Sequence, residues 1–224
     1  MGKIEFRTVE IEETIRTLAD FSFMLCNEPG LKKKEHEKFN RWVTDLKKIL
    51  AQISLFEKYT LPLITADLGS FKDRNLVLTA MMMRGTRKTF IEIKKFGENH
   101  HLPLSTEDLN YLIKSPETAA SLAWIGDTAI NFAALSHVWE PGITPEKLHD
   151  KRKSLETNKN LSELCDRWNL YQCRFYQDSD EPKEKKLNTI KGTLTEAIFG
   201  VIYVERDIRG VLEVLPLIDT REGN

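Results

Sequence analysis

Two carboxylates stand out because each is isolated in an apolar helical segment. Asp127 lies within Leu122–Leu135, where apolar side chains cover nearly every side of a helix, as in helices enclosed by other helices. Glu196 is the only charged residue between Lys191 and Glu205, also in an apolar segment. An ionised carboxylate is costly to bury unless a cation, a metal or strong donors meet it. The sequence therefore predicts a pair, distant along the chain, that shares one divalent cation.

Helical periodicity predicts the elements that must position these carboxylates. Longer helices are expected over residues 8–27, 35–55, 72–83, 116–139 and 193–215, and shorter ones opening at Ser105, Thr144 and Asn158. Pro116 is expected in the first turn of its helix, where a missing amide costs nothing. Residues 61–70 are expected to form a connector, and 172–188 a polar, mobile loop. No segment alternates with the period of a strand, so the protein is predicted to be all-α.

The amino-acid composition indicates which class of protein this is and in which cellular compartment it is expected. With 224 residues, 41% hydrophobic and 30% charged, the chain is typical of globular proteins. Its net charge of −1 gives no global sign of nucleic-acid binding, so any basic footprint must be local. Three cysteines without metal-type spacing favour a reducing compartment. No apolar segment approaches the roughly 18 residues of a membrane span, and the N-terminus lacks a signal-peptide pattern. The expected location is the cytoplasm, without membrane contact.

Three blocks of the sequence resemble one known family. Leu-Ala-Trp-Ile-Gly-Asp at 122–127 resembles the signature helix of the ribonuclease III domain, in the version found in Mini-III, the bacterial ribonucleases that lack a double-stranded-RNA-binding domain. Residues 148–151, followed by Leu155, Lys159 and Glu163, resemble the next Mini-III block, and residues 191–200 resemble the closing catalytic helix. A fainter similarity, at 71–81, is to the first helix of the general domain. Three blocks in the correct order and spacing are a fairly specific signal.

The sequence also departs from the family pattern at three positions. Ordinary ribonuclease III carries a glutamate where this chain has Ala123 and an aspartate where it has Thr193, but Mini-III resembles this chain at both positions. Asn131 stands where both groups usually carry glutamate. This last change leaves the predicted metal site with one fewer anionic neighbour.

The resemblance implies a metal-dependent endoribonuclease that hydrolyses double-stranded or structured RNA, such as a ribosomal RNA precursor. Asp127 and Glu196 would be catalytic ligands of Mg²⁺ or Mn²⁺, and Asn131 and Thr193 neutral ligands or groups that orient the ligands. Two carboxylates are few for a two-metal site, so one metal with bound water is expected. The resemblance also implies a homodimer whose two sites face opposite strands of one duplex. The plainer alternative for the carboxylates is burial beside helix caps or an arginine.

An RNA reader without a dedicated RNA-binding module must use basic side chains around its cleft. The candidates are Lys147, Lys151, Arg152, Lys153 and Lys191, together with Lys185 and Lys186 on the predicted loop. An ordinary solvated face is the alternative interpretation of these positions.

Residues 1–58 have no counterpart in the resemblance. They are predicted to be an N-terminal helical-hairpin extension that packs on the rest, dimerises or binds a partner, and residues 59–224 to be a ribonuclease III-like helical domain. Residues 86–101, rich in Lys, Gly and His, would be an insertion in that domain. The alternative function is a catalytically silent ribonuclease III-like protein that binds RNA or acts as a ribonucleoprotein scaffold. An all-α metal-dependent nucleotide hydrolase is a third possibility, but the chain lacks the clustered acidic motifs usual in that class.

Overall fold

The computed structural model describes residues 4–177 and 186–218, and within these ranges the protein is all-α, which confirms the predicted fold class. Extended pairing there is limited to one isolated bridge, between Met82 and Phe175. The elements in chain order are α1 (Ile11–Cys26), α2 (Lys33–Leu55), the π-helical turn η1 (Phe56–Thr60), α3 (Leu61–Leu68), α4 (Arg74–Ala80), α5 (Thr86–Gly97), α6 (Thr106–Val138), α7 (Pro145–Leu155), α8 (Asn158–Arg167), α9 (Leu187–Val214) and the 3₁₀ turn η4 (Leu215–Ile218).

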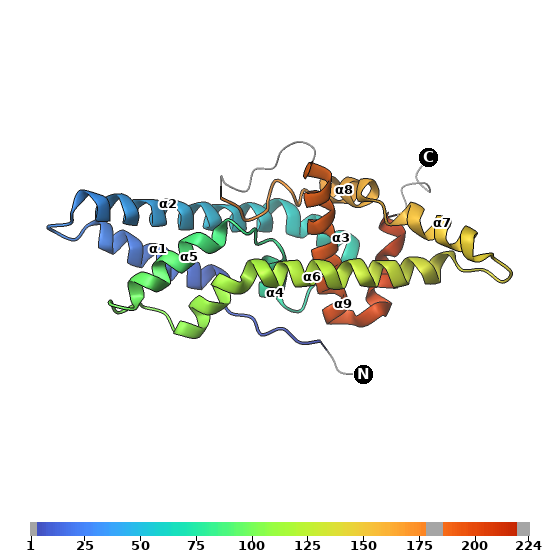
Figure 1. The fold of residues 1–224 in the computed structure, drawn as a ribbon, viewed down its shortest axis with the longest axis horizontal. Coiled ribbons are helices and arrows are strands. Elements are labelled where there is room, and N and C mark those ends of the chain that lie inside the picture. The colour runs from blue at the N-terminus through green and yellow to red at the C-terminus, as the bar shows by residue number, and fades with distance from the viewer. Residues whose placement is uncertain (1–3, 178–185, 219–224) are drawn as a thin grey trace.

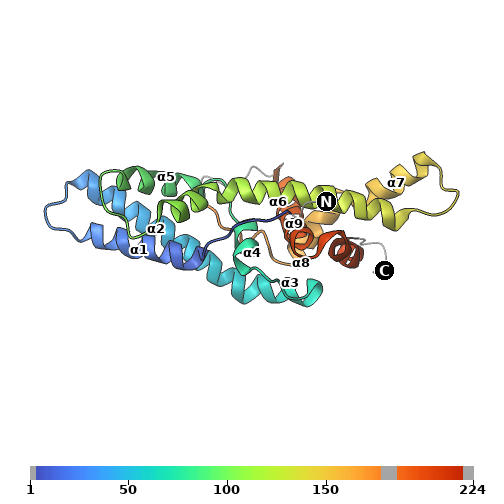
Figure 2. The ribbon, with the colours of Figure 1, turned by 90° about the horizontal axis from the view of Figure 1, so that it is seen from below.

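The helices form an elongated bundle along α6, the longest of them (Figure 1). The α1–α2 hairpin and α5 occupy one end, and α7 occupies the other (Figures 1 and 2). Near the middle, α9 crosses α6, and α8 packs on α9. None of the helices in the described residues is long and apolar enough to cross a membrane.

The N-terminal hairpin packs on the remainder of the chain and does not stand apart from it. Amphipathic spacing in α1 and α2 buries one face of each helix, and the buried side chains join a single core that continues to η4. Polar contacts cross the same boundary, since Arg74 pairs with Glu12 and Glu57. Gln52 exchanges two hydrogen bonds with the backbone of Tyr176, at 3.2 and 3.1 Å. The hairpin is therefore part of the same core.

The predicted connector at 61–70 is wrong, because residues 61–68 are helical. The helical path of α2 continues through η1 into α3, and Leu61 N–H donates to the carbonyl of Phe56, five residues back. Pro62 lacks the amide that an uninterrupted α-helix would use. A π turn placed just before a proline keeps the chain helical across that position.

The predicted helix start at Pro116 is also wrong. Ser105 caps α6, its Oγ accepting from the amide of Asp108 at 3.0 Å, and the helix then runs without a break to Val138. A proline inside a helix costs about 3 kcal/mol. Leu112 and Leu122, on either side of Pro116, are both fully buried, so packing of the two halves offsets that cost.

Part of the predicted loop at 172–188 is ordered and buried. Cys173, Arg174 and Phe175 lie in the core, and Phe175 pairs with the chain beside Met82. α9 already begins at Leu187, so the loop prediction fails there too. The rest of this segment, 178–185, lies outside the described residues.

Candidate metal centre

Two glycines allow α6 and α9 to cross with their backbones in contact. A Cβ on Gly126 would overlap the carbonyl oxygen of Glu196, and a Cβ on Gly200 would overlap the carbonyl oxygen of Leu122. Because the atoms in the way are backbone, no side-chain movement could make room, and only glycine fits either position. Asp127 follows Gly126 directly, and Glu196 lies one turn before Gly200. The crossing therefore brings together the two carboxylates predicted from the sequence.

The pKa of Glu196 is raised by burial and also because the charge of Asp127 is close to it. Burial, and then the charge of Asp127, raise the pKa of Glu196 to about 7. Within the described residues, the Glu196 carboxylate has no hydrogen-bond or ion-pair partner, and the Asp127 carboxylate accepts only from Asn131. In the part of the chain that the structure describes, no cation is paired to either of these neighbouring carboxylates, an arrangement that a divalent ion would stabilise.

Asn131 contacts the Asp127 carboxylate from the next turn of α6. Its Nδ2 donates to Asp127 Oδ1 at 3.1 Å and to the Asp127 carbonyl at 2.8 Å. Its Oδ1 accepts from Nη1 of Arg152, on α7. Asn131 therefore connects Asp127 to a guanidinium group.

Glu156, at the C-terminal end of α7, is a site residue that the sequence reasoning missed. Its Oε1 pairs with Arg152 Nη1 at 2.7 Å, and its Oε2 is buried without a hydrogen-bond partner in the described structure. Burial raises the pKa of Glu156, with Arg152 opposing the shift and Asp127 adding to it. The i,i+4 spacing of Arg152 and Glu156 was the one sequence signal that could have drawn attention to the pair.

The donor set fits a hard divalent cation that keeps much of its water. Carboxylate oxygens are the protein ligands that Mg²⁺ prefers, and it retains several waters when bound by one or two of them. In the described ranges, no three His, Cys, Asp or Glu side chains are arranged to hold a metal ion together. Asp127 and Glu196 would therefore hold a metal as a pair, with water completing its coordination.

Thr193 is not brought to the carboxylates by any contact in the described structure. It is exposed on α9, and its hydroxyl donates to the carbonyl of Thr189 at 3.0 Å. It lines an apolar depression between α6 and α9 together with Pro116 and Ala119.

The predicted basic residues fall into two groups. Lys147, Lys153 and Lys186 are exposed. Lys151 pairs with Glu140 at 3.0 Å, Lys191 pairs with Asp166 at 2.7 Å, and Arg152 is held by Asn131 and Glu156. Lys185 lies outside the described residues.

One face of α6 beside the carboxylates carries exposed apolar side chains. Trp124 is 75% exposed, Phe132 57%, Leu135 38% and, directly after the helix, Trp139 61%. The spacing of eight and three residues places Trp124, Phe132 and Leu135 on one face of α6, and Trp139 follows the end of the helix. Asn131 borders this apolar stripe. Contiguous exposed apolar surface of this kind is typical of interfaces.

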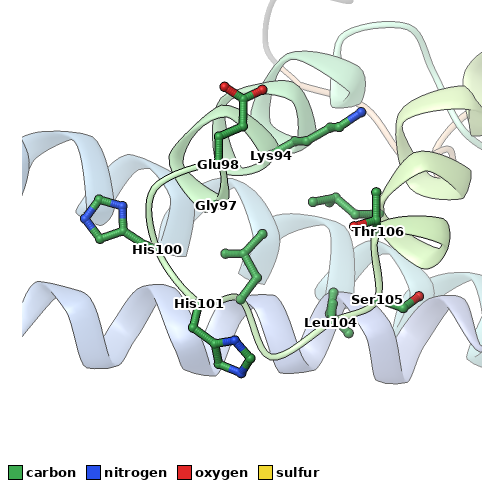
Figure 3. A pocket seen from close by; sticks show the side chains of 10 residues that line it. Lys94, Gly97, Glu98, His100, His101, Leu104, Ser105 and Thr106 are labelled. Carbon is green, nitrogen blue, oxygen red and sulfur yellow. The ribbon is translucent and has the colours of Figure 1, made fainter.

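A separate depression lies far from the carboxylates, between the end of α5 and the start of α6 (Figure 3). His100 and His101 both line it, but their rings point in different directions. His100 stacks on Phe96 with ring centroids 3.9 Å apart, and its Nδ1 donates to the Phe96 carbonyl at 2.9 Å. The two histidines are therefore not a paired metal site.

Comparison with known proteins gives two concordant results. The ribonuclease III domain family matches residues 120–207, which hold the α6–α9 crossing and both carboxylates. A curated relative, Ribonuclease 3 of Chloroflexus aggregans (strain MD-66 / DSM 9485), is 25% identical over 158 residues, 69% of this chain. The chain spans 61% of the length of that relative. The family resemblance is thus confirmed over residues 120–207, which match the ribonuclease III domain family.

Proposed function

We propose that the protein is a metal-dependent endoribonuclease that cleaves double-stranded or structured RNA. The observation that carries the proposal is the approach of Asp127 and Glu196 at the glycine crossing, where neither carboxylate is paired with a cation from residues 4–177 or 186–218. The family match over the same helices supports it. A ribosomal RNA precursor is the substrate class that the Mini-III resemblance suggests. Ala123 and Thr193 support the Mini-III type over ordinary ribonuclease III.

The chemistry follows from the charges at the site. A bound divalent ion makes water more acidic and stabilises negative charge on a phosphate under attack. Asp127 and Glu196 would hold such an ion, and Asn131 would orient Asp127 through its 3.1 Å hydrogen bond. Arg152 supplies a fixed positive charge at the same edge of the site.

We also propose that the active form is a homodimer. The apolar stripe of Trp124, Phe132, Leu135 and Trp139 exposes large side chains on the helix that carries Asp127. A second copy that covers this face would place two carboxylate pairs near one duplex, so that both strands could be cut. The three cysteines are free and buried, which supports a reducing compartment and therefore the cytoplasm.

A catalytically silent, RNA-binding scaffold is the alternative, and one contact favours it. Asn131 replaces an anionic neighbour of the metal, and its amide oxygen binds the Arg152 guanidinium instead. A cation at that edge of the site opposes metal binding.

A cleavage assay separates the two functions. The protein is incubated with Mg²⁺ or Mn²⁺ and a long RNA duplex, beside Asp127→Asn and, as a matched control, Asp20→Asn, which changes an exposed carboxylate on α1. Staggered cuts by the wild type and the control, absent with Asp127→Asn, support the nuclease. Intact RNA with retained binding supports the scaffold.

A further inference from the structure

The outward face of α5 is strongly basic and lies outside the residues that match the family. Arg84, just before the helix, and Arg87, Lys88 and Lys95 within it are all exposed. Their spacing places them with Ile91 on one side of the helix. They line a shallow depression together with Glu92. This face belongs to the segment that the sequence suggested to be an insertion.

Helix α2 extends the same face. Arg41 pairs with Glu92 across the α2–α5 contact, and Lys38 lies over the rings of Trp42 and Phe96, with Nζ 4.6 and 5.2 Å from their centroids. We call the set Lys38, Arg41, Arg84, Arg87, Lys88 and Lys95 the α5 basic face. Within the described residues, Glu92 and Glu117 form ion pairs with members of this face, and Asp45 accepts a hydrogen bond from Thr89 on the same helix. The face therefore carries an excess of three positive charges in a chain whose net charge is −1.

Ion pairs at both edges hold this face in place. Arg87 pairs with Glu117 on α6, and Arg41 pairs with Glu92. Between these edges, the side chains of Arg84, Lys88 and Lys95 make no hydrogen bond or ion pair within the described residues. Within the described residues, these three cations can therefore contact an anionic partner without first breaking a direct ion pair, while the charge of Lys88 also acts on Glu92.

The α5 basic face reaches α6, the helix that carries Asp127. Glu117, the partner of Arg87, precedes Asp127 by ten residues of the same helix, or about 15 Å at the α-helical rise. Arg84 also lines the depression beside Pro116 and Thr193, which continues toward the α6–α9 crossing. In Figures 1 and 2, α5 and α6 lie side by side. One extended anionic ligand could reach both places.

We infer that the α5 basic face binds the phosphate backbone of the RNA duplex beyond the position of cleavage. This inference rests on the proposed function, since it gives the same substrate a second contact surface. A duplex that extends about 15 Å along α6 from the position of cleavage would bring its backbone to the edge of this face. Backbone contacts of this kind give affinity and register without reading sequence.

Duplex binding tests the inference independently of cleavage. Full-length Asp127→Asn is titrated into a labelled RNA duplex of about 30 base pairs at several salt concentrations, with binding followed by fluorescence anisotropy. Lys88→Glu/Lys95→Glu is compared, in the same background, with Lys58→Glu/Lys72→Glu. Lys58 and Lys72 are exposed and lie just before α3 and α4 in the chain. In Figure 2, α3 lies on the opposite side of the bundle from α5. The two double variants change net charge equally.

The α5 variant is expected to weaken binding at least about tenfold and to reduce the slope of log affinity against log salt by about two, because each phosphate contact contributes about 0.9. The control should bind like the parent. Equal affinity and slope for the two variants would overturn the inference but leave the proposed function standing. A parent that does not bind duplex RNA overturns both. If Lys88→Glu/Lys95→Glu changes only the oligomeric state, the face contacts protein and the inference is wrong.

Discussion

The carbonyl oxygen of Glu196 occupies the space that a Cβ on Gly126 would need. The helices α6 and α9 can therefore approach this closely only because Gly126 has no side chain. Gly200 makes the reciprocal approach to the Leu122 carbonyl. Since Asp127 and Glu196 flank these contacts, a change in helix separation would also move the carboxylates apart.

Gly126→Ala is expected to destabilise the protein by about 2–3 kcal/mol, because extra atoms in a packed contact force backbone shifts. Urea unfolding followed by circular dichroism measures the change. Gly192→Ala, on α9, is the control. Its added Cβ would lie 3.1 Å from Asn158 Oδ1, the end of a side chain that can move. There the helix propensity of alanine favours stability by up to about 1 kcal/mol. Equal losses in both variants would contradict the backbone contact as the cause.

The pKa of Glu196 predicts a stability difference that depends on pH. The carboxyl has an ordinary pKa of 4.5 and a raised pKa of about 7 in the folded protein. The folded state therefore binds the proton more tightly, and this contribution to stability is present below 4.5 and lost as pH rises through 7. At pH 8 without metal, Glu196→Gln should be more stable than wild type by on the order of 1 kcal/mol, after allowance for partial exposure.

Thermal unfolding at pH 8 and at pH 4.5 measures this difference, which should vanish at the lower pH. Addition of Mg²⁺ at pH 8 should raise the Tm of the wild type and leave Glu196→Gln nearly unchanged, because the metal binds the ionised carboxylate. A variant that is less stable than wild type at pH 8 in the absence of metal would show that Glu196 has a stabilising partner.

Arg152 and Glu156 are expected to be energetically coupled. Their side chains are only 24% and 13% exposed, and removal of Arg152 would leave Glu156 buried beside Asp127 without its cation. Arg152→Ala should cost about 1–3 kcal/mol, and a double-mutant cycle with Glu156→Gln should give a coupling of about 0.5–2 kcal/mol.

Lys159 and Glu163 provide a matched control for this cycle. They have the same i,i+4 spacing in the neighbouring helix α8, but their side chains are 80% and 46% exposed. Lys159 Nζ lies 3.8 Å from Glu163 Oε1. Their coupling should be about 0.3 kcal/mol. If the coupling energy of Arg152 and Glu156 is no larger than that of this exposed pair, the interpretation of Arg152 and Glu156 as a buried, coupled pair is wrong. Mg²⁺ titration of Arg152→Ala should show tighter metal binding, since a competing cation is gone.

The sequence could predict those features that depend on local pattern. Asp127 and Glu196 were visible because a single charge in an apolar helix has few structural explanations. Glu156 was not visible, because α7 is polar along its length and only tertiary packing buries that carboxylate. Pro116 and Phe175 show the same limit. Pro116, which was expected to begin a helix, lies inside the longer helix α6. Phe175, in a segment that is mostly polar, is buried in the core.

The apolar stripe on α6 predicts self-association that depends on particular side chains. Phe132 lies on the helix face that a second copy would cover, Trp139 directly follows the helix, and both side chains are more than half exposed. Phe132→Ser/Trp139→Ser should shift the protein from dimer to monomer, with at least a tenfold rise in the dimer dissociation constant by analytical ultracentrifugation. Phe23→Ser, on α1, is the control, because Phe23 is 54% exposed at the other end of the bundle. A wild type that is monomeric at micromolar concentration would contradict the proposed dimer. A stripe variant that dimerises as well as the control would show that the dimer contact lies on another face. If the stripe variant is monomeric, its duplex cleavage should change from paired cuts to single-strand nicks, since each monomer carries one carboxylate pair.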